Sequence, residues 1–197
     1  MKKNKICGFA VLLAAAALLG GCSQIGGTSS TEATAEPAAT LATMSEYALI
    51  DGFTQYNSPD GGFSVQLPEG SVINDADVND VTITVASDYD NADMVSVKRE
   101  TSGIYLIENA DQLDDMLGED YSSEVSGFTV LTRDGEYCGY KYSYSSMGND
   151  KLKGVVSMYM NRDGSAYRVE GIINNGDDPQ NVEKMNTIVD TFVSYYM

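Results

Sequence analysis

Apolar and polar residues alternate in several short stretches after position 60, a pattern typical of strands with one buried face. Residues 63–67 and 81–85 each place an apolar side chain at every second position. Further strands are expected over residues 94–99, 128–133, 136–145, 152–161 and 165–174. Asp134-Gly135 and Asp163-Gly164 divide the last four strands into two pairs, and Asp-Gly is a strong signal for a tight hairpin.

Two other segments carry apolar residues at helical spacing. The first extends from Leu106 to Leu117, with Asn109 as a suitable N-cap and Gly118 as a suitable end. The second follows Pro179, and one face of it carries Val182, Met185, Val189, Phe192 and Tyr196. Strands joined by hairpins, with helices that cover them, predict an α+β fold: a mostly antiparallel sheet of about six to seven strands covered by two helices.

The start of the chain has a different pattern. Three lysines precede an apolar run from Ile6 to Leu19. A run of about 14 residues is too short for a membrane-spanning helix, which needs roughly 20, but it suits the apolar core of an export signal. The run ends in Leu19-Gly20-Gly21-Cys22.

This ending resembles the lipobox of bacterial lipoproteins. The resemblance implies that residues 1–21 are a signal peptide and that the thiol of Cys22 receives a lipid. The protein would then be held at the cell membrane, on its extracytoplasmic face. An ordinary signal peptide followed by an incidental cysteine is the alternative.

Residues 22–45 are rich in Ser, Thr and Ala and contain no aromatic residue. Such a segment buries too little apolar surface to offset the entropy of ordering it. We therefore expect a lipidated cysteine with a flexible tether over residues 22–45 and a single domain over residues 46–197, a common size for one domain.

Charge narrows the range of partners. The chain has 12 Lys+Arg against 29 Asp+Glu, a formal charge of −17. Loss of the three signal lysines would leave 9 basic residues against the same 29 acidic ones, which gives −20. So acidic a protein is not expected to bind nucleic acid, because both are polyanions.

The segment Tyr56-Asn57-Ser58-Pro59-Asp60-Gly61-Gly62-Phe63-Ser64-Val65-Gln66-Leu67-Pro68-Glu69-Gly70, together with the order of elements, resembles the PsbP-like superfamily. DcrB-like and LpqN-like bacterial lipoproteins belong to the same group. The resemblance covers roughly residues 50–197 and implies an α/β/α sandwich around an antiparallel sheet. It implies a binding or assembly module and brings no catalytic residues with it.

The residue types argue against the common hydrolytic enzymes. The chain has no histidine, which removes the commonest general base and the commonest zinc ligand. Cys138 would be the one thiol left after processing, so an internal disulfide is not expected. We interpret it as a small buried side chain, with a reactive thiol as the alternative.

Calcium is the one cofactor for which the sequence offers candidate ligands. Oxygen-bearing side chains occur at alternate positions in Asp75-Ala76-Asp77-Val78-Asn79-Asp80, as at the start of an EF-hand loop, but the glycine and the final glutamate of such a loop are missing. The candidate ligands are Asp75, Asp77, Asn79, Asp88, Asp90 and Asp93. A solvated acidic rim without calcium is the favoured interpretation, and no other cofactor is expected.

Tyrosines are concentrated on the predicted strand 136–145. Strict alternation would place Tyr140, Tyr142 and Tyr144 on one face with Cys138, and Tyr137 with Lys141 on the other. The first group forms either a ligand platform or, as we favour, part of the core. Tyr137 and Lys141 are the candidate contact residues on the outer face.

These observations favour a non-catalytic binding or assembly module, anchored in the membrane by its lipid, with an envelope protein or small ligand as partner. A calcium-dependent or glycan-binding surface module is one alternative, and an enzyme of unrecognised type is another.

Overall fold

The computed structural model describes residues 48–86, 92–118 and 122–197. The predicted signal peptide, Cys22 and the predicted tether lie outside these residues, so these assignments stay predictions. Within the described part of the chain, no helix has the length and apolar character needed to cross a membrane.

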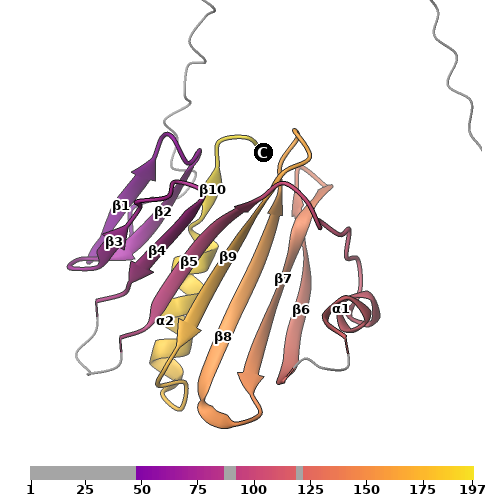
Figure 1. Cartoon of the computed structure of the whole chain (residues 1–197). Coiled ribbons are helices and arrows are strands. Elements are labelled where there is room, and N and C mark those ends of the chain that lie inside the picture. Colours follow the sequence, from indigo (N-terminus) through magenta and orange to yellow (C-terminus); the bar gives the residue numbers. More distant parts are fainter. Residues whose placement is uncertain (1–47, 87–91, 119–121) are drawn as a thin grey trace, which may run out of the picture. The chain divides into compact units, whose positions relative to one another are not determined.

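Ten strands and two helices are present in the described residues (Figure 1). Seven strands form one sheet in the order β3-β4-β5-β9-β8-β7-β6, and every pairing in it is antiparallel. These strands are β3 (Val72–Asn74), β4 (Asp80–Thr84), β5 (Met94–Glu100), β6 (Ser123–Arg133), β7 (Glu136–Ser146), β8 (Asn149–Met160) and β9 (Ala166–Ile173). A smaller sheet consists of β1 (Phe53–Ser58), β2 (Phe63–Pro68) and β10 (Val193–Ser194), and the helices are α1 (Ala110–Leu117) and α2 (Pro179–Asp190). The predicted α+β class is confirmed.

One face of the seven-stranded sheet packs against α2 and the small sheet. Met185 and Val189 of α2 share a buried cluster with Val155 and Tyr159 of β8 and with Val169 of β9. The small sheet contributes Phe63, whose ring stacks on Phe192 with ring centroids 5.5 Å apart. In Figure 1 this helix lies behind the sheet.

The opposite face packs against α1. Leu113 of this helix is buried with Tyr140 and Tyr142 of β7 and with Val156 and Met158 of β8. Val155 and Val156 are successive residues of β8 that belong to different clusters, and successive strand residues point to opposite faces. The two helices therefore cover opposite faces of the sheet, as the predicted α/β/α sandwich requires.

The hairpin at Asp134-Gly135 forms as predicted. Arg133 pairs directly with Glu136, so the loop has two residues. Both loop residues have positive φ, 53° at Asp134 and 82° at Gly135. A two-residue turn of this kind matches the twist of the strands that it joins.

The extent of both helices differs from the prediction. The first begins at Ala110, after the N-cap Asn109, whose side chain accepts from the backbone N–H of Gln112 at 3.0 Å. Leu106 lies before the helix and is 61% exposed, so its place in the predicted apolar face was wrong.

The second helix ends at Asp190, which corrects the predicted helical face through Phe192 and Tyr196. The Thr191 side chain donates to the carbonyl of Ile188 and accepts the backbone N–H of Gln66. The chain then pairs with β2 as β10, so a contact with a distant strand replaces the next helical turn.

Candidate functional site

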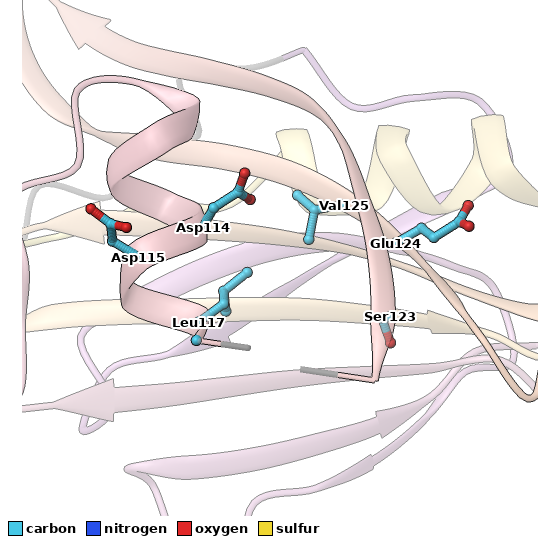
Figure 2. Close-up of a pocket in the computed structure, with 7 residues that line it drawn as sticks. Asp114, Asp115, Leu117, Ser123, Glu124 and Val125 are labelled. Atoms are coloured by element: carbon cyan, nitrogen blue, oxygen red, sulfur yellow. The ribbon is translucent and has the colours of Figure 1, made fainter. Parts of the chain in front are cut away.

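A recess lies between α1 and the beginning of β6 (Figure 2). It has a volume of about 650 Å³. Its described lining comes from the last turns of α1 and the first residues of β6: Asp114, Asp115, Leu117, Gly118, Ser123, Glu124 and Val125. Val125 points from the strand toward the helix in Figure 2. The lining thus combines apolar side chains with three carboxylates.

These carboxylates do not form a catalytic pair or a metal site. Figure 2 shows Asp115 and Glu124 pointing away from each other, on opposite sides of the recess. Asp114 and Asp115 are both exposed. Within the described ranges, no three His, Cys, Asp or Glu side chains are grouped so that they could hold a metal ion. Acid–base chemistry needs groups directed at one reacting atom, and Asp115 and Glu124 lack that arrangement.

A second recess, of about 370 Å³, lies on the α2 side of the sheet. Its floor includes Leu131 of β6, Cys138 of β7, Tyr159 of β8 and Phe192, and Arg133 stands beside them. Burial raises the pKa of the Cys138 thiol, which disfavours the reactive thiolate. Cys138 was predicted to be a small buried side chain, and in the structure it is only partly buried.

A β-bulge at Cys138 overturns the predicted faces of β7. Leu131 pairs with Gly139 and the next residue, Thr132, pairs with Tyr137, so Cys138 is the extra residue. Gly139 has φ 148°, and a Cβ there would collide with the carbonyl oxygen of Met158. The side chains of β7 therefore do not alternate strictly between the two faces of the sheet from Tyr137 to Tyr140.

As a result, Tyr137 does not share an outer face with Lys141. The Tyr137 hydroxyl donates to the carbonyl of Ile107 at 3.0 Å and accepts the N–H of the same residue at 3.2 Å, on the α1 side of the sheet. Lys141 lies on the α2 side, where its Nζ is 2.6 Å from a carboxylate oxygen of Asp190. The two candidate contact residues are thus separated by the sheet. Cys138 likewise lines the α2-side recess and does not share the face of Tyr140, contrary to the prediction.

The tyrosines of β7 support the core interpretation over the ligand platform. Tyr140 and Tyr142 are each 3% exposed, and their rings stack with centroids 6.4 Å apart. Tyr144 is partly buried and donates to a carboxylate oxygen of Glu170 at 3.0 Å. Burial raises the pKa of Tyr140 to about 12.

The calcium candidates fall into separate environments. Asp75 is exposed and accepts from the Tyr56 hydroxyl, while Asp77 accepts from the backbone N–H of Asn79. Asp93 is fully buried and accepts from the backbone N–H of Asn174 at 2.9 Å. Asp88 and Asp90 lie outside the described residues. Calcium binding by this set stays a prediction.

The recess beside α1 was missed by sequence reasoning. The predicted strand began at Phe128, whereas β6 begins at Ser123. The added residues, Ser123 to Gly127, include one apolar side chain, so periodicity alone carries little signal there. The alternation of Val125 with Glu124 and Ser126 was the available clue.

Comparison with known proteins finds no matching family model and no matching curated protein. Solved structures do match. The PsbP protein CyanoP of the cyanobacterium Synechocystis sp. PCC 6803 aligns with a TM-score of 0.56 at 16% identity, over 74% of this chain and 94% of that one.

A second structural match is Mog1p, a Ran-binding protein of Saccharomyces cerevisiae. It aligns with a TM-score of 0.50 at 6% identity, over 73% of this chain and 95% of that one. At these identities the matches show a shared fold, and the predicted PsbP-like architecture is confirmed at that level.

Proposed function

We propose that this protein is a lipid-anchored component of the extracytoplasmic face of a bacterial cell membrane, and that its folded domain binds a partner without catalysing a reaction. The observation that carries the binding role is the recess between α1 and β6. It combines apolar side chains with two carboxylates of α1 and one of β6, a strand at the border of the sheet.

The fold supports the same role. Mog1p, which shares it, is a Ran-binding protein, so this architecture is compatible with protein binding. The formal charge of −17 adds a preference for a basic partner, because complementary charge speeds association and suppresses wrong pairings. An envelope protein with a basic surface fits this proposal better than nucleic acid does.

The anchor is tested separately from the binding role. Cys22→Ala should abolish incorporation of labelled fatty acid and move the protein out of the membrane fraction. The exported domain should still fold, because the buried residues of its larger core cluster run from Phe63 to Phe192, far from Cys22 in the sequence. Cys138→Ala is the matched control and should leave labelling intact. Unchanged labelling of Cys22→Ala would refute the lipid anchor.

The binding role is tested by capture. The chain, immobilised at low salt, should retain an envelope protein that elutes as salt is raised, since screening weakens interactions between exposed charges. A purified partner should then bind the chain directly and reversibly. Turnover of a defined substrate that is lost when one carboxylate is replaced would defeat the non-catalytic assignment.

A further inference from the structure

The outer edge of β6 differs from the other border of the seven-stranded sheet. The sheet ends with β3 on one side and β6 on the other. β3 has 3 residues, whereas β6 has 11. Among the described residues, β7 is the one strand that pairs with β6, and no backbone hydrogen bond joins the outer edge of β6 to a further segment. Such an edge presents unpaired N–H and C=O groups to any extended chain that approaches it.

The pairing register restricts where an added strand would fit. Two irregularities interrupt β6, one between Ser126 and Thr129 and one between Leu131 and Thr132. Bulges twist an edge and make it a poor template for pairing. The uninterrupted part before the first bulge runs from Ser123 to Ser126, and three of these residues also line the recess beside α1.

The walls of that recess specify the chemistry of the occupant. Leu117 and Val125 offer apolar surface, and the lining also includes the carboxylates of Asp114 and Asp115 on α1 and of Glu124 on β6. None of the described lining residues is basic. A strand added here would place alternate side chains on the two faces of the sheet, and Val125 and Glu124 occupy those two faces of β6.

We propose that the Ser123–Ser126 edge of β6 accepts an extended basic peptide segment as an additional strand, with α1 as the facing wall. This inference rests on the proposed binding function and names its partner class. Backbone hydrogen bonds would supply affinity, and the carboxylates would select lysine or arginine side chains. A second copy of this chain fits poorly, because it would bring another charge of −17 to the same edge.

The test uses the full chain in mild detergent and a fluorescein-labelled, end-capped peptide of alternating lysine and valine. Fluorescence anisotropy should show saturable binding that weakens with salt. The double variant Asp115→Lys and Glu124→Lys should weaken binding at least about tenfold, since it turns two attractions into repulsions. The control is the double variant Glu69→Lys and Glu183→Lys, which makes the same charge change at two sites away from the recess, one in the turn after β2 and one on α2. It should change the peptide affinity by less than about twofold.

Peptide N-methylation tests strand pairing itself. In an antiparallel pair, alternate residues direct their N–H groups at the partner. Methylation of the peptide N–H groups that face β6 should abolish binding. Methylation of the N–H groups that face away from β6 should change the affinity by less than about twofold. Equal effects of both sets, or equal effects of the two charge-reversal pairs, would overturn the proposed edge. So would the absence of saturable binding.

This result is separable from the fate of the proposed function. If a purified envelope partner binds equally well to the chain and to the Asp115→Lys/Glu124→Lys variant, the binding module survives and the β6 site is rejected. If peptide binding follows the predicted pattern but no envelope protein is retained, the edge is supported and the physiological role is rejected.

Discussion

The two faces of the seven-stranded sheet have cores of different character. The α2 side also receives the small sheet and contains most of the largest fully buried side chains, among them Tyr167, Phe63 and Phe192. The α1 side is covered by an 8-residue helix, and Leu113 is the buried residue of that helix. We therefore expect the α2 side to supply most of the stability, whereas the α1 side has the smaller core and borders the recess beside β6.

Replacement of one aromatic residue on each side should reveal this asymmetry most strongly. Phe192→Ala removes a ring that contacts Phe63, Tyr159 and Tyr167, and should lower the free energy of unfolding by about 3–5 kcal/mol. Phe128→Ala, on the α1 side, removes a partly buried ring and should cost about 1–2 kcal/mol. Urea denaturation measures both. Equal losses would contradict the division between the two cores.

Alkaline titration should destabilise both sides through buried tyrosines. Burial raises the pKa of Tyr167 and of Tyr140 to about 12, above the ordinary value of 10.0. The folded state therefore disfavours the phenolate, so stability is intact below pH 10 and is lost as the pH rises toward 12. Melting temperatures across this window should fall less steeply in Tyr167→Phe and in Tyr140→Phe. Tyr105→Phe, at an exposed position, is the control and should leave the slope unchanged.

Asp93 tests a buried polar contact between the residue just before β5 and the segment that follows β9. Asp93→Ala leaves the backbone N–H of Asn174 without its carboxylate acceptor in a buried site, and should cost about 1–3 kcal/mol. Asp93→Asn retains an acceptor oxygen and should cost less. The comparison of both variants by urea denaturation separates the hydrogen bond from the charge. A neutral Asp93→Ala would show that this contact is dispensable.

Tyr137 tests how firmly the segment before α1 is held. Tyr137→Phe removes the hydroxyl that bonds both the N–H and the carbonyl of Ile107, and should cost about 1 kcal/mol. Amide exchange at Ile107 should become faster, while exchange in the α2-side strands stays slow. If exchange changes equally on both sides, the α1 side is no more loosely held than the rest.

Calcium should have the smallest effect. The described candidate ligands occupy separate environments, and the favoured interpretation is a solvated acidic rim. The melting temperature in millimolar calcium should therefore equal the melting temperature in the same concentration of magnesium. A calcium-specific rise would show binding to the native state by mass action and would support the predicted calcium site.

Much of the candidate binding surface could not be predicted from the sequence. The helix around Leu113 and its N-cap at Asn109 could be predicted, because both depend on residues within one or two helical turns. The start of β6 could not be predicted in this way, because Ser123 to Ser126 owe their strand conformation to pairing with β7. Tyr137 and Lys141 of β7 were assigned to the same face for a related reason. The bulge at Cys138 depends on the close approach of β8 to Gly139, which local sequence does not reveal.

By itself, the sequence determined the class of the fold, most of its strands, the Asp134-Gly135 hairpin and the two amphipathic helices. Each of these follows from local periodicity or from turn residues with defined backbone preferences. The tertiary structure alone decided where α2 ends, because Thr191 and β10 contact β2 more than a hundred residues earlier in the chain. It also decided that Tyr137 and Lys141 face opposite sides. One extra residue in a strand reverses every face assignment beyond it, and that register is set by partner strands rather than by neighbours in the sequence.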